Sequence, residues 1–180
     1  VYYTGAFDNG IFMSELEFSY KYDENGKVVD ISCKTVSEKK FIWYGTGGND
    51  PEGPHLYKIN GWYYLLISEG GTEFCHMITV ARSRNIWGEY ESCPRNPVFS
   101  NRSTSLPIKG TGHMDIVCDQ YGDWWGVCLA NRPITYPFKH NLGRETFLVP
   151  VEWDDKDWPV IGRNGLLDER ISSDRKLHEG

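Results

Sequence analysis

Glu52 is the residue whose surroundings most suggest chemistry. It lies in a Pro-Glu-Gly-Pro segment at residues 51–54, directly before an aromatic run. A carboxyl group that donates a proton needs a fixed direction and an environment that raises its pKa. Pro54 fixes its own φ and biases Gly53 toward extended geometry, and the missing side chain of Gly53 lets a substrate approach the backbone. Taken alone, the segment fits an ordinary turn with a solvated glutamate better than it fits a proton donor.

Short strands and turns surround Glu52 on both sides. Turn signals with glycine after asparagine or tyrosine stand at residues 23–26, 60–61 and 120–123. Strands are expected at residues 1–5, 11–18, 62–67, 76–82, 124–129 and 145–153. No amphipathic helix is predicted, and the proline-rich residues 93–107 are expected to cross a surface. The residues expected to be largely buried lie in continuous apolar runs: Trp62, Tyr64, Leu66, Val127 and Leu129.

A turn followed by an aromatic strand recurs along the chain. Such recurrence indicates radial repetition of small antiparallel sheets, as in a β-propeller. A β-sandwich would give similar turns. The pattern therefore predicts an all-β fold and leaves these two architectures open.

The composition limits the classes of partner. The 180 residues are enough for one good core. Aromatic residues make up 14% of the chain, which suits stacking on the apolar faces of sugars and suits a β-rich core equally well. A net charge of −6 and a pI near 5.4 argue against a nucleic-acid partner. No apolar run of membrane-spanning length and no signal-peptide pattern is visible, so no membrane partner is expected and the compartment, cytoplasmic or secreted, stays open.

The five cysteines give an odd number, and no pair of them has the spacing of metal ligands. Cys118 and Cys128 lie in apolar runs and are predicted to be buried thiols. A disulfide of a secreted protein is the less favoured alternative.

Seven short blocks carry a family resemblance. They are Glu-Gly-Pro-His-Leu-Tyr-Lys at 52–58, Asn-Gly-Trp-Tyr-Tyr-Leu at 60–65, Glu-Gly-Gly-Thr-Glu at 69–73, Thr-Val-Ala-Arg-Ser at 79–83, Ile-Trp-Gly at 86–88, Gly-His-Met-Asp at 112–115 and Leu-Gly-Arg-Glu-Thr at 142–146. In this order and spacing the chain resembles glycoside hydrolase family 43, in particular its β-xylosidases and α-L-arabinofuranosidases. The resemblance implies a five-bladed β-propeller of which this chain covers about three blades. Residues 1–165 would be a partial propeller glycosidase domain, residues 166–180 a tail or linker, and the N-terminal blade or blades would lie upstream of Val1.

The resemblance also implies a reaction. Family members hydrolyse O-glycosidic bonds with inversion, and here the expected substrates are xylo- or arabino-oligosaccharides of plant hemicellulose. Glu52 matches the general acid. The aspartate that acts as base and the aspartate that raises the pKa of the acid match no residue of this chain and would lie upstream of Val1, so the isolated chain is expected to be weakly active or inactive. Asp8 and Asp115 do not match the base; Asp8 is expected to be solvated in a loop and Asp115 to make structural hydrogen bonds.

Four further residues are candidate substrate contacts. Arg144 matches an arginine that clamps sugar hydroxyls, with a structural pair to a carboxylate such as Glu145 as the alternative. His113 matches a histidine near the propeller axis that binds substrate, water or a central Ca²⁺, with a satisfied core histidine as the alternative. Thr72 would line the sugar pocket or serve a turn. Arg132 would face substrate or anchor a loop, and the anchor is favoured.

The expected function is therefore hydrolysis of glycosides, with an oligosaccharide as partner. A non-catalytic carbohydrate-binding propeller fragment is the alternative. No cofactor is required by this mechanism, and Ca²⁺ beside His113 is the one ion that the resemblance allows. The choice between xylose and arabinofuranose stays open.

Overall fold

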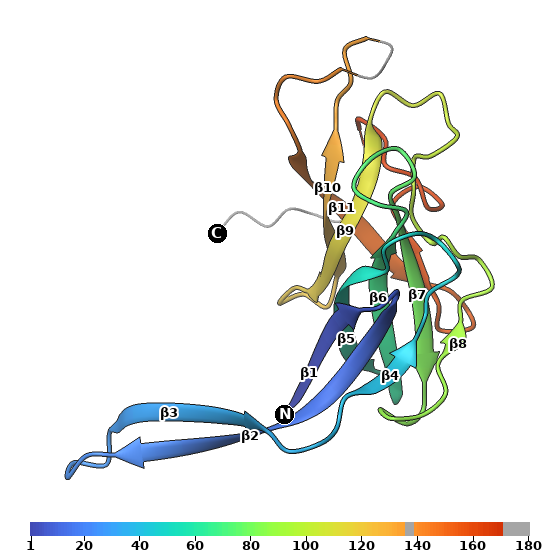
Figure 1. Cartoon of the computed structure of the whole chain (residues 1–180). Helices are drawn as coiled ribbons and strands as arrows, with labels where there is room; N and C mark the ends of the chain where they lie inside the picture. Colours follow the sequence, from blue (N-terminus) through green and yellow to red (C-terminus); the bar gives the residue numbers. More distant parts are fainter. Residues whose placement is uncertain (136–138, 171–180) are drawn as a thin grey trace.

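Three four-stranded sheets follow one another along the chain in the structure, a computed structural model that describes residues 1–135 and 139–170 (Figure 1). The first contains β1 (Tyr2–Phe7), β2 (Gly10–Tyr22), β3 (Val28–Thr35) and β4 (Lys40–Trp43). The second contains β5 (Glu52–Ile59), β6 (Trp62–Glu69), β7 (Met77–Ser83) and β8 (Glu91–Ser92). The third contains β9 (Lys109–Cys118), β10 (Trp124–Asn131), β11 (Glu145–Trp153) and β12 (Pro159–Ile161).

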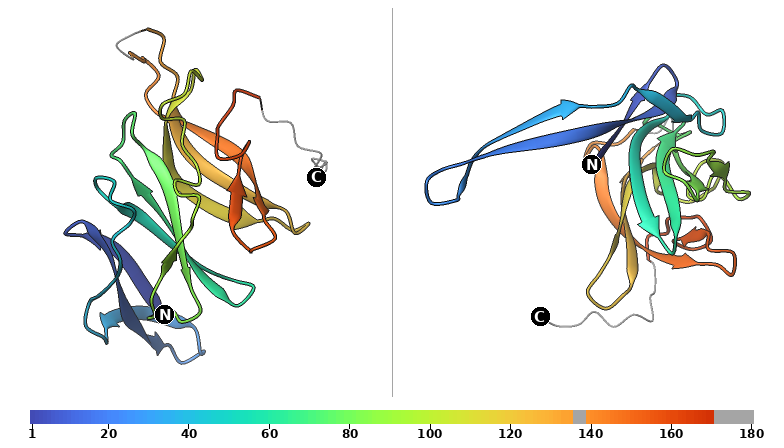
Figure 2. Two further views of the ribbon diagram at one scale, coloured as in Figure 1. Left: turned by 90° about the vertical axis from the view of Figure 1, so that its right-hand side faces the viewer. Right: turned by 90° about the horizontal axis from the view of Figure 1, so that it is seen from below.

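The elements of the described residues are all strands, which confirms the predicted all-β class. Within these residues no helix is long and apolar enough to cross a membrane. The second sheet has the strand order β5-β6-β7-β8 and the third the order β12-β11-β10-β9, so each is a simple antiparallel meander. Figure 2 shows the three sheets side by side in chain order, as successive propeller blades are arranged, rather than stacked in two layers.

The first sheet carries a long two-stranded arm. The first half of β2 pairs with β1 and β4, and its second half pairs with β3 and projects away from the body (Figure 1). The predicted turn at residues 23–26 closes this arm: the Asp23 carboxylate accepts bonds from the backbone N–H groups of Asn25 and Lys27. Ion pairs between Lys21 and Asp30 and between Lys34 and Glu17 follow one face of the arm.

Strand β6 is buried on both faces, which explains its unbroken apolar run. Leu65 and Ile67 pack into a cluster with the first sheet, while Tyr64 and Leu66 pack into a larger cluster with the third sheet. The burial predicted for Tyr64 and Leu66 is thus confirmed, while Trp62 is half-buried.

Strand β10 differs from its prediction. Val127 is exposed and Leu129 is half-buried, whereas Cys128 and Ala130 face the core. The run is continuous in sequence, but only one face of β10 meets the second sheet, and side chains alternate between the two faces. Cys118 is likewise exposed rather than buried, because it ends β9 at the turn to β10.

The proline-rich connection differs from its prediction in its middle part. Val98 and Phe99 are buried, and Phe99 pairs with Ile78 beside β7. Asn101 is fully buried and its side chain bonds to the backbone of Ile108 and Leu167. Residues 98–101 are therefore part of the core, whereas residues 102–107 are exposed or half-buried, as a connection across a surface would be. Leu167 is buried as well. Most of the predicted tail, residues 171–180, lies outside the described residues.

The thiols provide a test of this packing. Cys33, Cys75 and Cys118 are exposed free thiols, whereas Cys93 and Cys128 are buried. Burial raises the pKa of Cys93, and it raises the pKa of Cys128 to about 12, so neither forms the reactive thiolate at pH 8. We expect a thiol reagent to titrate three cysteines rapidly in the native chain and all five in denaturant. Rapid reaction of four or five thiols without denaturant would contradict the fold.

Candidate active site

Glu52 is the first residue of β5 and lies opposite Ser68 of β6. The pairing of the two strands is irregular between Glu52 and His55, at the Gly-Pro corner seen in the sequence. Gly53 has a φ of 55°, in the left-handed region, and not the extended geometry predicted from Pro54. Glycine adopts this geometry without a steric cost, and the corner needs it where the ladder is interrupted. The Glu52 side chain is 37% exposed, so the carboxylate is open to a ligand.

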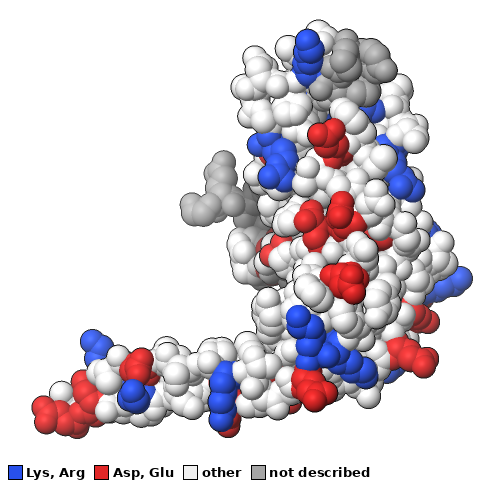
Figure 3. Space-filling view, viewed as in Figure 1, with Lys and Arg blue, Asp and Glu red and all other residues white. Residues whose placement is uncertain are grey.

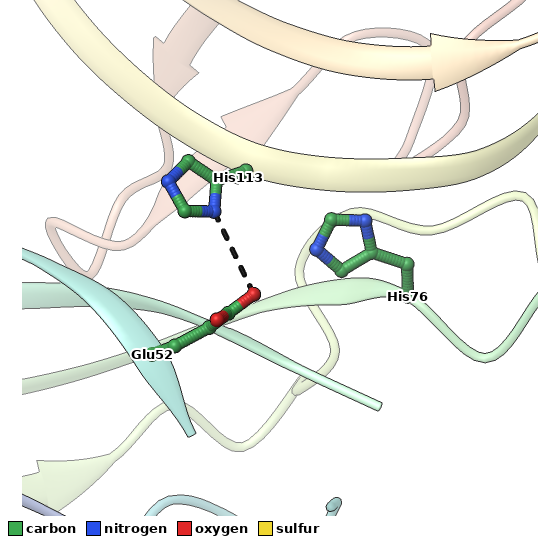
Figure 4. Close-up of side chains that lie close together, drawn as sticks. All are labelled: Glu52, His76 and His113. Atoms are coloured by element: carbon green, nitrogen blue, oxygen red, sulfur yellow. Dashed lines mark ion pairs between the residues drawn. The ribbon is translucent and has the colours of Figure 1, made fainter. Parts of the chain in front are cut away.

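His113 faces Glu52 from the third sheet. Its Nδ1 lies 3.7 Å from Oε1 of Glu52 (Figure 4). The backbone of His113 has a φ of 49°, an unfavourable value for histidine, and its N–H donates to the buried Ser68 hydroxyl at 2.8 Å. A side chain at position 53 would meet the His113 ring at 3.1 Å, so Gly53 is needed here for close approach as well as for its φ.

His76, just before β7, completes a group of three that the sequence analysis missed. Its side chain is almost fully buried, and Nδ1 lies 3.1 Å from the Gly110 carbonyl. A carbonyl only accepts, so Nδ1 carries the hydrogen and Nε2 presents a lone pair. Nε2 has no partner among the described residues, and the ring faces Glu52 and His113 (Figure 4). Burial lowers the pKa of His76; the Gly110 bond and the Glu52 charge oppose this shift, and the neighbouring His113 and Arg144 add to it.

A pocket of about 260 Å³ lies beside this group. Thr72 and Arg144, both predicted substrate contacts, line it together with Glu73, Phe74, Asn131 and His140. Gly110, whose carbonyl contacts His76, lies against two residues that line this pocket: a Cβ at position 110 would meet Asn131 Nδ2 at 3.0 Å and the Glu73 carbonyl at 3.1 Å. The pocket therefore adjoins the group on its His76 side. The Oδ1 atom of Asn131 is buried at the pocket without a partner in the described part of the chain.

The two arginines differ in their contacts. Arg132 bonds to Glu145 at 3.0 Å, lies 3.6 Å from Glu169 and stacks its guanidinium over the Phe147 ring. Arg132 is thus engaged with two carboxylates and an aromatic ring, contacts that a loop anchor would make. No residue within 1–135 and 139–170 forms an ion pair with Arg144, so its planar set of donors is available to the pocket.

The remaining carboxylates lie around the same region. Asp115 accepts a short hydrogen bond from the Tyr57 hydroxyl, and His55 Nδ1 lies 3.4 Å from it, so Asp115 links β9 to β5. Asp8 lies in the turn between β1 and β2 and lines an open hollow of about 350 Å³ together with Glu52 and Asp50. On the face seen in Figure 3, Asp and Glu side chains gather in the middle of the body, where β5 and β9 lie.

Among the described residues, one ligand atom each of Glu52, His76 and His113 lie within 4.8 Å of one another, as in a metal site. Calcium binds six to eight oxygen ligands, and this group offers two imidazole nitrogens and one carboxylate. The group therefore does not fit the Ca²⁺ expected beside His113. Its nitrogen donors suit transition metals instead.

The comparisons with known proteins decide the family. Residues 4–159 match the model of glycosyl hydrolases family 43. The chain belongs to family 43. It is 48% identical over 147 residues to the non-reducing end alpha-L-arabinofuranosidase BoGH43B of Bacteroides ovatus, covering 81% of this chain and 26% of that protein. It is 45% identical over 146 residues to a xylosidase/arabinosidase of Butyrivibrio fibrisolvens, covering 78% of this chain and 28% of that protein.

Solved structures of family 43 agree with this assignment. The xylan beta-1,4-xylosidase of Bacillus halodurans superposes with a TM-score of 0.77 at 35% identity, over 94% of this chain and 31% of that one. The GH43B protein of the Bacteroides ovatus xyloglucan locus gives a TM-score of 0.72 at 34% identity, over 99% and 34%. The chain thus forms about three blades of the five-bladed propeller, and it spans about a quarter of the length of the curated relatives it matches.

The residues that the sequence analysis missed gave little signal. His76 directly precedes β7 and Asn131 ends β10, and neither appears in the arguments from motif or turn chemistry. His140 lies in the long connection from β10 to β11, where no element was predicted. An isolated histidine or asparagine becomes informative only when its neighbours in space are known.

The different contacts of the two arginines predict different effects on stability. The variant Arg132→Gln leaves Glu145, whose Oε2 is buried, without its cation. We expect the free energy of unfolding to fall by about 1–2 kcal/mol. The matched variant Arg144→Gln removes no ion pair with a described residue, so we expect its free energy of unfolding to stay within about 0.5 kcal/mol of that of the unchanged chain. Urea unfolding of the two variants and the unchanged chain measures both. Equal losses would show that Arg144 is also a structural residue.

Proposed function

We propose that the protein carrying this chain hydrolyses O-glycosidic bonds in xylo- or arabino-oligosaccharides, with Glu52 as the general acid. The observation that carries the proposal is the position of Glu52. Glu52 starts β5 beside a glycine corner, and its partly exposed carboxylate faces His113 of the third sheet and borders an open hollow between the β1–β2 turn and β5. A proton donor to a glycosidic oxygen needs this combination of fixed direction and access.

The neighbouring pocket supplies the sugar contacts in this proposal. Arg144 offers a planar set of N–H donors that matches vicinal hydroxyl groups, and Thr72 offers a hydroxyl in the same pocket. Their pocket adjoins the Glu52–His113 pair, so a sugar bound by Arg144 would present its glycosidic oxygen toward Glu52. His113, held by Ser68, fixes one side of the acid.

An inverting reaction also needs a carboxylate that activates water from the opposite side of the sugar, roughly 6.5–9.5 Å from the acid. The aspartates that serve as base and as modulator of the acid in family 43 have no match within residues 1–180. The proposal therefore assigns to this chain the proton donor and part of the sugar pocket.

The role of Glu52 is tested by leaving-group dependence. In a polypeptide that carries this chain together with the family's two aspartates, Glu52→Gln should slow hydrolysis of poor leaving groups by about 10²–10⁴-fold. Activated aryl glycosides need little protonation, so their hydrolysis should slow much less. Glu17→Gln, on the exposed arm, is the matched control and should behave as the unchanged protein. An equal loss on both substrate types would refute the assignment, and sugar binding without any turnover would favour the non-catalytic alternative.

The 180-residue chain by itself should not hydrolyse aryl xylosides or aryl arabinofuranosides at a useful rate. A missing base costs about 10²–10⁴-fold, because water must then attack without proton removal. The assay compares the chain with its Glu52→Ala variant. Clear turnover that is abolished by this change would show that a base lies within the chain, and Asp8, which lines the same hollow as Glu52, would be the first residue to test.

A further inference from the structure

We propose that Glu52, His76 and His113 form a binding site for a transition-metal cation, with Zn²⁺ as the best fit, and that the bound ion withdraws Glu52 from proton donation. The existence of the site is independent of the proposed function. Its inhibitory effect rests on the role of Glu52 as the acid.

The three ligands come from three separate segments of two sheets. Glu52 starts β5, His76 precedes β7 and His113 lies in β9, yet one ligand atom of each falls within 4.8 Å of the others. Ligands around a tetrahedral Zn²⁺ lie about 3.3 Å apart, from bond lengths near 2.0–2.1 Å. The Glu52–His113 separation of 3.7 Å is already close to this value, and both side chains are partly exposed and able to close the remainder.

The ring of His76 is held in the orientation that a metal ligand requires. Histidines that bind metals usually donate their other ring N–H to a carbonyl or carboxylate, which fixes the ring. His76 does so through Nδ1 to Gly110, and its buried Nε2 faces the group without a partner in the described residues (Figure 4). A side chain at Gly112 would lie 2.4 Å from the His76 ring, so β9 packs directly on this imidazole and holds it in place.

The donor set selects the class of metal. Two imidazoles and one carboxylate are a common set of zinc ligands, which leaves a fourth position for water or another small ligand. Calcium prefers oxygen donors alone, so it should bind here poorly. The acidic side chains in the middle of this face favour the approach of cations (Figure 3).

A bound cation would change the chemistry of Glu52. The carboxylate that coordinates the metal uses the oxygen lone pair that otherwise carries the proton. Metal binding and proton donation by Glu52 therefore exclude each other. Zinc should inhibit hydrolysis in the proposed enzyme, and a chelator should restore it.

Calorimetric titration of the 180-residue chain with ZnCl₂, and separately with CaCl₂, tests the site without any assay of hydrolysis. We expect saturable binding of one Zn²⁺ per chain and much weaker binding of Ca²⁺. The variants His76→Gln and His113→Gln should each weaken Zn²⁺ binding at least about 10-fold, since even loss of a residue that merely orients a ligand costs about 10–100-fold. The matched control is His55→Gln, which changes a histidine of β5 that does not belong to the group and should leave Zn²⁺ binding unchanged.

Two outcomes would overturn the proposal: no saturable Zn²⁺ binding by the unchanged chain, or binding that survives both variants. Circular dichroism shows whether the buried change His76→Gln preserves the fold. If His76→Gln disrupts the fold, two other measurements test the site. One is Zn²⁺ binding by the more exposed variant His113→Gln. The other is the visible absorption of a Co²⁺-loaded chain, which reports tetrahedral nitrogen and oxygen ligands. If zinc binds to an active polypeptide without inhibiting it, only the inhibitory effect is refuted. If Glu52 proves not to be the general acid, the proposal of a metal site is unaffected.

Discussion

The burial of β6 on both faces is the constraint on which the rest of the structure depends. Its side chains alternate between a core shared with the first sheet and a core shared with the third. The alternation continues into the polar end of the strand. Ser68 points toward the third sheet, where its hydroxyl receives the His113 N–H, and Glu69 points toward the segment that leads to Glu52. One strand thus fixes both sides of the candidate site.

Glu69 is a fully buried carboxylate whose bonds go to neutral donors. It accepts bonds from the backbone N–H groups of Thr46 and Gly48 and from the Thr79 hydroxyl. A buried charge is tolerated when several donors satisfy it, and these bonds hold the chain just before β5. A side chain at Gly45 would fall within 2.6 Å of this carboxylate, so the segment can approach it only as glycine. The direction of Glu52 is therefore set by a residue that does not belong to the site.

The candidate site lies where three sheets meet. Glu52 and Thr72 come from the second sheet, His113 and Arg144 from the third, and Asp8 borders the hollow from the first. The strained backbone of His113 persists because the packing of β9 on β6 leaves its N–H a single buried partner, Ser68. Changes in the cores between the sheets should therefore reach the chemistry by moving one sheet against another.

The sequence by itself determined much of the local structure and singled out Glu52 as the candidate acid. Turns such as Asn60-Gly61, and strands such as β6 and β11, follow from backbone preference and apolar runs, which are local properties. Strand β9 ends in an apolar run up to Cys118, but its first half carries glycines and polar residues that follow no period, although the glycine at 112 is what lets β9 pack on His76. The packing of one sheet on another decides which apolar residues are buried. Val127 and Cys128 are adjacent in sequence but lie on opposite faces of β10, and only Cys128 is buried. Likewise, only the tertiary structure brings His76 beside Glu52, because this contact joins segments far apart in the chain. Only the tertiary structure also distinguishes Arg144, which lines the pocket, from Arg132, which forms ion pairs.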